Sequence, residues 1–394
     1  MNHITQLVNQ LCPDGVEYKR LGDLGTFYGG LSGKSKADFT DGNAKFITYR
    51  NIYSNPALNL DDDATVKIRE NERQNVIEYG DVLFTGSSET PDECGFSSVV
   101  TKKPTEKMYL NSFCFGYRLN DKIFIPDFLK HLFRSNNLRK QIFKTASGVT
   151  RYNVSKKLFA EIEIPVPPLQ IQEEIVRVLD SFSALEAELE AELEARQRQY
   201  AHYRDALLQF DCSVTTKKLG DVCKVITGGE APKNATKEKT DKNIYAIYAN
   251  AKEEYGFTDS YTVDKDAVSI SSIGAKTGTI YFRQKNFTPI IRLKVLLPID
   301  ETILLPKYLY YALLKVNFKT KQGGIPNINA NDVKRIEIPI PPLEEQQRIV
   351  DILDKFAALT TDLQRGLPAE LAARRKQYAH YRDALLTFKK REND

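Results

Sequence analysis

The chain has 394 residues, of which 41% are hydrophobic and 27% are charged, and its formal net charge is +4. Such a chain is long enough for two or three domains with cores of their own, and its composition is that of a globular protein. The sequence has no apolar run that could span a membrane and no signal-peptide pattern at its start, so we expect a cytoplasmic protein without a membrane segment.

The cysteine and histidine patterns argue against a metal site. The five cysteines show no CxxC spacing, and the chain has four histidines. Structural zinc sites need closely spaced pairs of such ligands. We therefore expect reduced cysteines that pack as ordinary side chains, and no bound metal.

Residues 1–164 predict a globular domain. An opening helix at about residues 4–11 ends at a CPDG turn, and short alternating segments with Gly, Asn and Asp turns then extend to residue 120. This pattern is typical of a twisted, irregular sheet. A helix at roughly residues 126–143 and a short strand at residues 162–164 complete the domain.

A long helix is predicted at residues 165–210. The pair Pro167-Pro168 marks its start, because proline suits a first helical turn. From Ile171 onward the apolar residues alternate in spacings of four and three, as in a coiled coil, and the tetrapeptide run LEAELEAELEAR follows. The segment carries four basic and nine acidic residues, so we expect a polyanion to bind the globular domains instead.

The second half of the chain repeats the first. The decapeptide QYAHYRDALL occurs at residues 199–208 and again at residues 377–386, each time downstream of a Pro-Pro-Leu motif. An identity of this length indicates a duplication. A second globular domain is therefore predicted at residues 211–338, and a second long helix at residues 339–394.

The two long helices differ in the middle. The first is predicted to be continuous, and about forty residues at about 1.5 Å each make a rod of roughly 60 Å. In the second, Gly366 and Pro368 have the order of a helix stop and a helix start. We therefore expect a break near residues 366–368.

Motifs for three enzyme classes are incomplete. The Gly-rich segment at residues 29–35 ends in GKS, but a phosphate loop needs glycine where Tyr28 stands. The carboxylates and lysine at residues 14–19 have the chemistry of a nuclease, yet they fit one polar turn. The Asn-Pro-Pro-Tyr loop of an amino-methyltransferase has its nearest match in NPA at residues 55–57. We therefore expect no catalytic residues, with a nuclease in the first globule as an alternative.

Two windows at matched positions of the repeat favour nucleic-acid binding. Residues 128–160 contain eight lysines and arginines and no acidic residue, and residues 302–331 contain four lysines and no acidic residue. Basic side chains suit phosphates, and amides suit base edges. For either window taken alone, a solvated helix face is the alternative.

Residue type and loop position select the candidate DNA contacts. The candidates for phosphate contacts are Lys34, Lys36, Arg139, Lys140, Lys144, Lys233, Lys276, Lys319 and Lys321. The candidates for base-edge contacts are Ser87, Ser88, Thr150, Arg151, Asn327 and Asn329. The neighbours Ser35, Tyr152 and Thr277 complete the predicted DNA-binding set.

The repeated decapeptides predict an interface. His202 and His380 stand at identical positions, but their recurrence follows from the duplication, and neither has the partner that a general base needs. Tyrosines three residues apart form one helix face. We expect packing or subunit binding by Tyr200, Tyr203, Arg204, Tyr378, Tyr381 and Arg382.

With these motifs in hand, the chain resembles the specificity subunit of type I restriction-modification systems over nearly its whole length. The resemblance rests on the Pro-Pro-Leu entries into long helices, the QYAHYRDALL repeats, the Leu-Gly-Asp domain starts and the LEAE run. In that family, two target recognition domains each read one half of a bipartite DNA sequence. An antiparallel helix pair holds them apart and docks two modification subunits.

The resemblance implies an α+β fold in which two domains of mixed, irregular β-sheet with helices are separated by two long helices in an antiparallel coiled coil. The expected function is sequence-specific recognition of double-stranded DNA by a non-enzymatic subunit that binds no cofactor itself. S-adenosylmethionine is then expected on the modification subunits, and ATP with magnesium on restriction subunits that join through the complex. The alternative from another class is a coiled-coil scaffold that binds protein and no DNA.

The resemblance also implies a use for the tetrapeptide run, because duplications at such a place alter the gap between half-sites in that family. One four-residue unit lengthens a helix by about 6 Å and turns it by about 40°. Each base pair adds about 3.4 Å along a DNA strand. A change of one or two base pairs in the gap is therefore expected.

Overall fold

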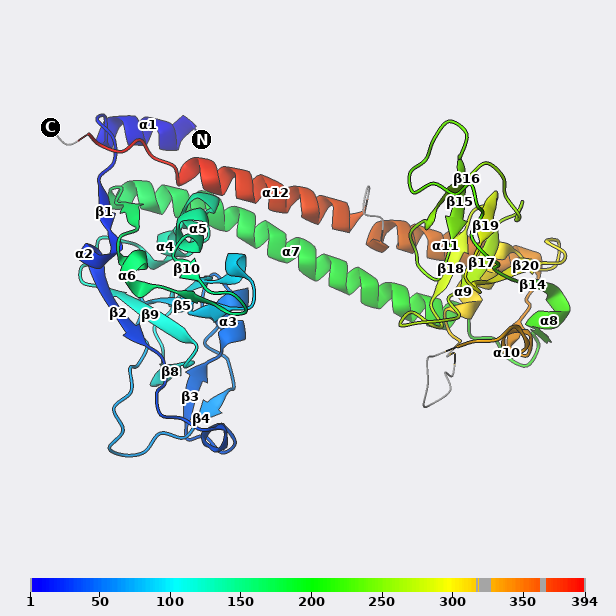
Figure 1. The fold of residues 1–394 in the computed structure, drawn as a ribbon, viewed down its shortest axis with the longest axis horizontal. Helices are drawn as coiled ribbons and strands as arrows, with labels where there is room; N and C mark the ends of the chain where they lie inside the picture. The colour runs from blue at the N-terminus through cyan, green and yellow to red at the C-terminus, as the bar shows by residue number, and fades with distance from the viewer. Residues whose placement is uncertain (1, 317, 319–326, 362–365, 393–394) are drawn as a thin grey trace. The chain divides into compact units, whose positions relative to one another are not determined.

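The computed structural model describes residues 2–316, 318, 327–361 and 366–392. It divides into two compact units, of which unit 1 comprises Met1–Leu189 with Leu371–Asp394 and unit 2 comprises Glu190–Glu370 (Figure 1). Each unit holds β-sheets and short helices next to a long helical segment. Within the described ranges, the helices lack the combination of length and apolar character that a membrane span requires.

Unit 1 is built on a four-stranded antiparallel sheet in the order β2-β9-β5-β7. These strands are β2 (Gly25–Gly29), β9 (Cys114–Leu119), β5 (Val82–Thr85) and β7 (Ser97–Val99). Tyr117 lies opposite Phe27 on one side and opposite Val82 on the other. Because β5 is buried on both faces, it forms the centre of the unit.

The other strands of unit 1 form three small sheets. The first pairs β1 (Tyr18–Arg20) with β12 (Glu163–Pro165). The second has the order β4 (Thr65–Val66), β3 (Ala44–Ile47), β8 (Met108–Leu110). The third has the order β10 (Ala146–Ser147), β11 (Tyr152–Val154), β6 (Ser87–Ser88). Strands β3 and β8 run parallel. Strand β6 follows β5 after one residue, so the third sheet brings the segment around residue 150 beside the end of the central strand.

The helices of unit 1 pack on both faces of its main sheet, because α4, α5 and α6 share a buried cluster with Val82 and Phe84, whereas Ile52 of α3 shares one with Leu83. They are α1 (Asn2–Leu11), α2 (Leu21–Leu24), α3 (Tyr49–Ser54), α4 (Pro126–Leu132), α5 (Asn136–Phe143) and α6 (Lys156–Ala160), with short 3₁₀ turns η1 (Lys36–Phe39) and η2 (Pro91–Glu93). The prediction of one helix at residues 126–143 is wrong in the middle. Ser135 starts a new helix there, because its hydroxyl accepts a hydrogen bond from the Leu138 amide.

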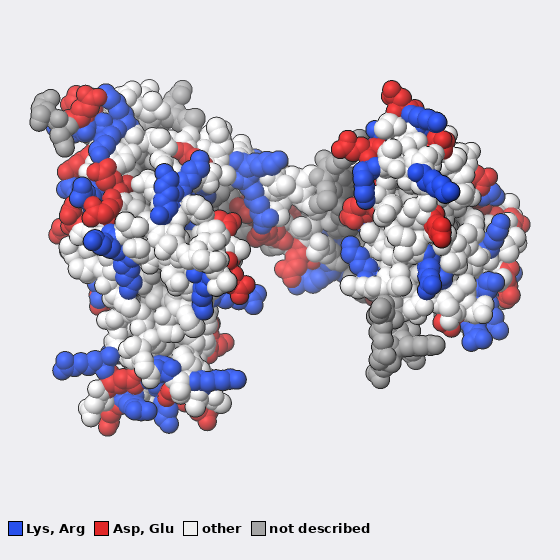
Figure 2. All heavy atoms as spheres, viewed as in Figure 1, with Lys and Arg blue, Asp and Glu red and all other residues white. Residues whose placement is uncertain are grey.

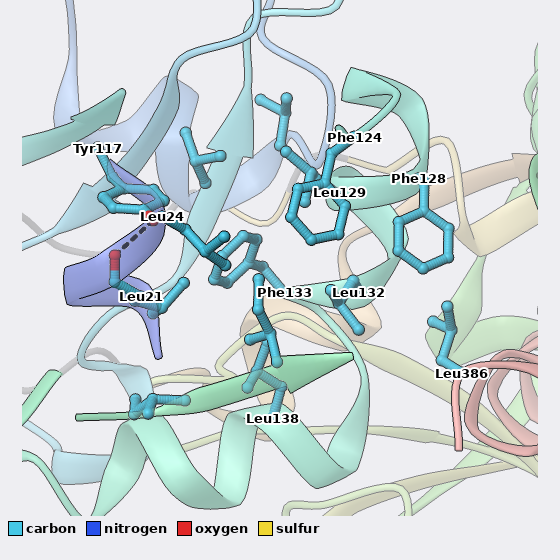
Figure 3. Close-up of a cluster of buried hydrophobic side chains, with 14 of the residues drawn as sticks. Leu21, Leu24, Tyr117, Phe124, Phe128, Leu129, Leu132, Phe133, Leu138 and Leu386 are labelled. Carbon is cyan, nitrogen blue, oxygen red and sulfur yellow. Dashed lines mark hydrogen bonds between the residues drawn. The ribbon is translucent and has the colours of Figure 1, made fainter. Parts of the chain in front are cut away.

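The core of unit 1 joins the sheet to α4. Phe128, Leu132 and Phe133 lie in one buried cluster with Leu21 and Tyr117 (Figure 3). The Tyr117 hydroxyl donates a hydrogen bond of 2.7 Å to the Leu21 carbonyl, so the one polar atom of this buried ring has a partner. Burial of these large side chains is the main stabilising contribution to the unit.

The first long helix, α7 (Leu169–Leu207), begins directly after the two prolines, as predicted. Its residues up to Leu189 belong to unit 1, where they pack against α12 (Leu367–Leu385). Phe182 stacks on Tyr381 with ring centroids 5.2 Å apart, and Glu186 accepts a hydrogen bond of 2.7 Å from Arg375. The partner number falls as the α7 number rises, so the two helices are antiparallel.

The two ends of the described chain meet in unit 1. The Val16 amide donates a hydrogen bond of 2.8 Å to the Lys389 carbonyl, and the Arg391 amide donates one of 2.9 Å to the Val16 carbonyl. Leu385 and Leu386 lie in the same buried cluster as Ile4. Residues near both ends of the chain therefore complete one core.

Unit 2 repeats the sheets of unit 1. Its main sheet has the strand order β14 (Cys223–Thr227), β20 (Lys294–Pro298), β17 (Ala267–Ile270), β18 (Ile280–Arg283). Its second sheet has the order β16 (Gly256–Thr258), β15 (Tyr245–Tyr248), β19 (Phe287–Pro289). Its third sheet pairs β13 (Thr216–Lys218) with β21 (Glu337–Pro339). Strands β15 and β19 run parallel, as β3 and β8 do in unit 1. The strand orders agree throughout these sheets, which confirms the predicted α+β fold with a repeated β-rich domain.

The helices of unit 2 also follow the repeat. They are α8 (Leu219–Val222), α9 (Pro306–Leu313), α10 (Ala330–Lys334) and α11 (Leu343–Thr361). The part of α7 from Glu190 onward belongs to unit 2 and packs against α11. Tyr203 stacks on Phe356 at 5.2 Å. In unit 2 the helix α11 ends at Thr361, and α12 begins at Leu367, so the break predicted near residues 366–368 stays a prediction. Residues 362–365 between them lie outside the described residues.

Candidate nucleic-acid interface

Four of the predicted base-edge contacts line one open cavity in unit 1. The cavity has a volume of about 650 Å³, and its polar lining includes Ser87, Ser88, Glu93, Thr150 and Arg151. Ser87 and Ser88 are buried, whereas Thr150 and Arg151 are exposed. An open cavity with a few convergent polar groups is a suitable place for specific recognition.

Local strand pairing brings these side chains together. Tyr152 of β11 lies opposite Ser88 of β6, so the turn before β11 carries Thr150 and Arg151 to the edge of the cavity. Gly148 begins this turn with a φ of +152°, and a Cβ there would lie 2.0 Å from the Arg151 carbonyl oxygen. The turn that presents Arg151 therefore requires glycine at this position.

The Nε atom of Arg151 is hydrogen-bonded within the protein, and its two terminal nitrogens are available to a ligand. Its Nε donates a hydrogen bond of 3.2 Å to the Ser87 hydroxyl, and its guanidinium lies 4.9 Å from the centroid of the Phe113 ring. Among the described residues, the two terminal nitrogens have no hydrogen-bond acceptor. They can therefore donate together to a pair of acceptors on a ligand.

Glu93 faces the same cavity and was not predicted. Its carboxylate accepts hydrogen bonds of 3.1 Å from the Tyr53 hydroxyl and 3.1 Å from the Ser88 hydroxyl. Side-chain hydrogen bonds from Thr90, Ser88 and Tyr53 hold the pKa of Glu93 below its usual value. The residue ends the three-residue turn η2, and no spacing or repeat in the sequence marks it.

Arg139, a predicted phosphate contact, points inward. Its guanidinium donates hydrogen bonds of 2.5, 2.8 and 2.7 Å to the carbonyls of Gly95, Asp92 and Cys94. Burial lowers the pKa of Arg139 to about 10, which leaves it charged at neutral pH. Because both terminal nitrogens donate to these carbonyls, Arg139 positions the loop that carries Glu93 and does not present them to a phosphate. Arg134 from the same basic window is tied in the same way to the Ser97 carbonyl.

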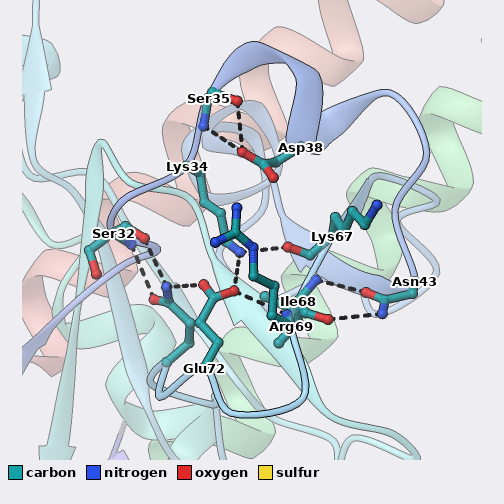
Figure 4. Close-up of polar contacts among 10 residues, drawn as sticks. Ser32, Lys34, Ser35, Asp38, Asn43, Lys67, Ile68, Arg69 and Glu72 are labelled. Atoms are coloured by element: carbon teal, nitrogen blue, oxygen red, sulfur yellow. Dashed lines mark hydrogen bonds and ion pairs between the residues drawn. The ribbon is translucent and has the colours of Figure 1, made fainter.

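Lys34 is likewise occupied within the protein (Figure 4). Its ammonium lies 2.5 Å from a Glu72 carboxylate oxygen and 2.5 Å from the Lys67 carbonyl, and its side chain is 4% exposed. The Lys34 ammonium holds the pKa of Glu72 at about 2. This loop is locked by an ion pair, and we exclude Lys34 from the proposed DNA surface.

The remaining predicted residues of unit 1 differ in availability. Lys36, Lys140 and Lys144 are exposed. The Ser35 amide and hydroxyl both donate to Asp38 at 2.8 Å, as Figure 4 shows. Tyr152 is half-buried in β11, and its carbonyl accepts a hydrogen bond from the Cys94 thiol. The three lysines can therefore contact phosphates, whereas Ser35 and Tyr152 support the local backbone.

Unit 2 has different side chains at the place that corresponds to the cavity of unit 1. Asn327 is exposed and forms a β-bridge with Ile273. Asn153 pairs with Ser87 in unit 1, and Asn327 occupies the equivalent position in unit 2. The Asn329 side chain accepts a hydrogen bond of 2.8 Å from the Asp332 amide and caps α10. This bond gives Asn329 a structural role.

The other predicted DNA-binding residues of unit 2 are four lysines and one threonine. Lys233 and Lys276 are exposed, and Lys276 lies in a turn whose Thr277 hydroxyl donates 2.6 Å to the Gly274 carbonyl. Lys319 and Lys321 lie outside the described residues. The available cations of unit 2 therefore lie on its loops.

The charge on the visible face is mixed. Figure 2 shows lysine and arginine side chains interspersed with acidic ones over both units on that face. Attraction of a phosphate to this face would therefore depend on local lysines and not on one large basic surface. Among the described residues, no group of three His, Cys, Asp or Glu side chains converges as metal ligands.

The residues predicted to bind other subunits mostly contact their own chain. The Tyr378 hydroxyl lies 2.8 Å from His131, and Tyr381 and Tyr203 stack on phenylalanines of the paired helix. Arg382 contacts Asp383 at 3.2 Å, and Arg204 contacts Asp205 at 2.9 Å. Tyr200 packs against the core of unit 2. The four tyrosines therefore take part in packing within the chain, and the binding of other subunits by these residues stays a prediction.

Comparison with known proteins gives consistent matches. The family model of the type I restriction modification DNA specificity domain matches residues 13–195 and again residues 213–373. A Haemophilus influenzae protein named as a type I restriction enzyme specificity subunit is 36% identical over 262 residues, which is 61% of this chain and 68% of that protein. The specificity subunit of the Escherichia coli enzymes EcoR124I and EcoR124II is 34% identical over 271 residues, 59% of this chain and 65% of that protein.

Two solved structures have a similar fold. The S subunit of a type I restriction-modification system from M. genitalium has a TM-score of 0.54 at 15% identity, with 94% of this chain and 96% of that chain covered. A chain from a study of complex assembly and conformational transition in the type I system has a TM-score of 0.58 at 20% identity, with 94% and 97% covered. At these identities the likeness concerns the fold.

Proposed function

The chain belongs to the family of type I restriction-modification DNA specificity domains, and from this premise we propose that units 1 and 2 each read one half of a bipartite sequence in double-stranded DNA. A specificity subunit of this family has two target recognition domains, is not catalytic and binds no cofactor itself. Recognition therefore has to come from side chains of the two units that reach base edges.

The observation that carries the proposal is the cavity of unit 1. Arg151 presents two free donors beside the buried hydroxyls of Ser87 and Ser88, at a place that solvent reaches. Exposed Lys140 of α5 and Lys144, the C-cap of that helix, supply cations for phosphate contacts from the same unit. Base-edge groups together with nearby phosphate contacts are what sequence-specific DNA binding requires.

Family membership also implies assembly with other subunits of a type I restriction-modification complex. We propose that two modification subunits dock on α7 and α12 and that restriction subunits join through the complex. S-adenosylmethionine and ATP with magnesium would bind to those subunits. We place this assembly in the cytoplasm, where its proposed DNA target lies.

The long helices are proposed to set the gap between the half-sites. Helix α7 is a single element of 39 residues that contributes to both units. A continuous helix transmits a change of length along its axis at about 1.5 Å per residue. The tetrapeptide run lies inside α7, so its length would alter the separation that the subunit measures.

The test is a binding titration against salt, with the modification subunit present and with a duplex that carries both half-sites. Specific binding predicts a linear fall of log affinity with log salt concentration, and Lys140→Ala should lower that slope by about one. A protein scaffold would not bind the duplex. A nuclease would cleave it with metal alone, without the other subunits.

Arg151→Ala tests the proposed reading residue. It should weaken recognition of one half-site by about tenfold or more and leave the other half-site unaffected, because the cavity belongs to unit 1. Lys34→Ala is a useful comparison, since the Lys34 ammonium already has protein partners and its loss should not change the salt slope. An equal loss at both half-sites with Arg151→Ala would contradict the proposal.

A further inference from the structure

Four charged residues line the cavity of unit 1, namely Arg50, Glu89, Glu93 and Arg151. Of these, Glu93 and Arg151 are each held by uncharged side chains and do not neutralise each other. Arg151 is held by Ser87 and lies over Phe113, and Glu93 is held by Tyr53 and Ser88. Among the described residues neither of the two has an ion-pair partner. The cavity therefore offers donors and an acceptor to one ligand at the same time.

A carboxylate is an unusual group at a DNA surface, because it repels phosphates. Glu93 can contribute to DNA binding only where the DNA presents a hydrogen-bond donor. In the major groove those donors are the exocyclic amino groups of cytosine and adenine. The chemistry of the side chain thus selects a base edge and excludes the backbone.

Several contacts fix Glu93 in place before any ligand binds. Two hydroxyls hold its carboxylate, and the Cys94 amide closes the η2 turn by donating 3.3 Å to the Pro91 carbonyl. Arg139 anchors the same turn through the carbonyls of Asp92 and Cys94. Side chains that are fixed in this way discriminate well, because little ordering is needed when the ligand binds.

We infer that Glu93 is a specificity-determining residue that accepts a hydrogen bond from the amino group of cytosine in a G·C pair whose guanine is bound by Arg151. The outer nitrogens of an arginine match the two acceptors of guanine, and a carboxylate matches the amino group of the paired cytosine. A single base pair then satisfies both Arg151 and Glu93. This inference rests on the proposed function of the cavity and extends it to one base pair.

The experiment has two parts and uses the complete complex with its modification subunits. First, methylome mapping of hosts that carry the wild-type system or the Glu93→Gln variant gives the methylated motif of each. We expect the motif of Glu93→Gln to lose its preference for G·C at one position of one half-site. Wild type should bind a duplex altered at that position about tenfold more weakly than the unaltered duplex. For Glu93→Gln, the difference in affinity between the two duplexes should be smaller.

The deciding measurement of the second part uses the wild type, so it does not depend on the folding of a variant. Wild-type complex is titrated with a duplex in which 2-pyrimidinone, which lacks the amino group, replaces the cytosine at that position. We expect about tenfold weaker binding, and Glu93→Ala should show no further loss with this base. Equal binding of both duplexes by wild type would overturn the inference.

Matched variants separate the possible failures. Glu89→Gln makes the same charge change at an exposed residue of the same cavity and should leave the motif unchanged. If it relaxed the same position, the effect would be one of charge alone and the inference would fail. If Arg151→Ala relaxes a half-site and Glu93→Gln does not, the inference fails while the proposed function stands. If neither changes recognition, the proposed function of the cavity fails as well.

Discussion

Gln172 shows how one side chain can join a long helix to its globule. It is fully buried in the first turn of α7, where its oxygen accepts 2.9 Å from the Ile125 amide and its nitrogen donates 2.9 Å to Ile123 and 2.8 Å to Pro167. Gln346 repeats all three bonds at the start of α11 in unit 2. The duplication has kept a complete hydrogen-bond set, as burial of an amide requires.

Replacement of this amide should be costly. Gln172→Leu removes the partner of one buried amide group and two carbonyls, and we expect the free energy of unfolding to fall by about 3 kcal/mol. Chemical denaturation followed by circular dichroism measures the change. Gln170→Leu, at an exposed position of the same turn, should cost no more than about 0.5 kcal/mol. Equal stabilities of the two variants would mean that these bonds contribute nothing net.

The roles of single charged residues were only partly predictable. Arg151 was selected as a candidate base contact from its loop position and its side chain, and the structure places it at an open cavity, while its contact with a base stays a prediction. Lys34 and Arg139 looked similar in the sequence, but their partners are distant along the chain: Glu72 is 38 residues from Lys34, and Gly95 is 44 from Arg139. Whether a cation is free depends on such tertiary contacts, and these have no signature in composition.

At the scale of elements, His131 links three helices of unit 1. Its ring, 2% exposed on α4, lies 2.7 Å from Asp180 of α7 and 2.8 Å from Tyr378 of α12. Lys130 shares Asp180 and also binds Asp127. A neutral ring that donates to Asp180 and accepts from Tyr378 satisfies both contacts. Tyr311 stands in place of His131 in unit 2 and donates to Asp354.

The contacts of His131 with Asp180 and Tyr378 should weaken in mild acid. Burial lowers the pKa of His131, against the hydrogen bond with Asp180, which raises it. The folded form therefore takes up a proton less readily than the unfolded chain, whose histidine titrates near about 6.5. The associated stability is complete above that pH and is lost as the pH falls through it.

Hydrogen exchange measures the effect within one molecule. After correction for intrinsic rates, the amides of α4 should lose protection between pH 7.5 and pH 5.5, whereas those of α9 should not, because Tyr311 does not titrate in this range. His131→Phe should abolish the difference between the two pH values. Equal behaviour of α4 and α9 in the wild type would contradict the assignment.

Long elements were predicted better than short ones. The start of α7 and its continuity follow from the proline pair and the heptad spacing, which act locally. The division of residues 126–143 into α4 and α5 depends on the Ser135 cap, and a serine inside an apolar pattern does not by itself indicate a cap. The strand orders could not be read from short alternating segments, since their pairing depends on distant contacts.

At the scale of the whole molecule, the proposed gap between half-sites depends on the length of α7. Insertion of one Leu-Glu-Ala-Glu unit after Glu192 lengthens the helix by about 6 Å and turns it by about 40°. We expect the methylated motif to keep both half-site sequences while the gap changes by one or two base pairs. Methylome mapping reads both quantities together.

A variant of equal length serves as the control. Exchange of residues 189–192 from LEAE to LQAQ changes charge and keeps the helix length, so the gap should stay as it is in the wild type. An insertion variant with an unchanged gap would show that α7 does not set the separation. An insertion that altered a half-site sequence would show that the units are not independent readers.

The meeting of residues 16 and 389–391 in unit 1 has a consequence for synthesis on the ribosome. Unit 2 lies wholly between the two segments of unit 1, so it emerges and can fold while the first globule still lacks α12 and its terminal strand partner. Domains generally fold as they are made, but unit 1 is incomplete until its second segment has been synthesised. Until then Ile4 and its apolar neighbours lack Leu385 and Leu386 of their buried cluster, and this surface is open to chaperones and proteases.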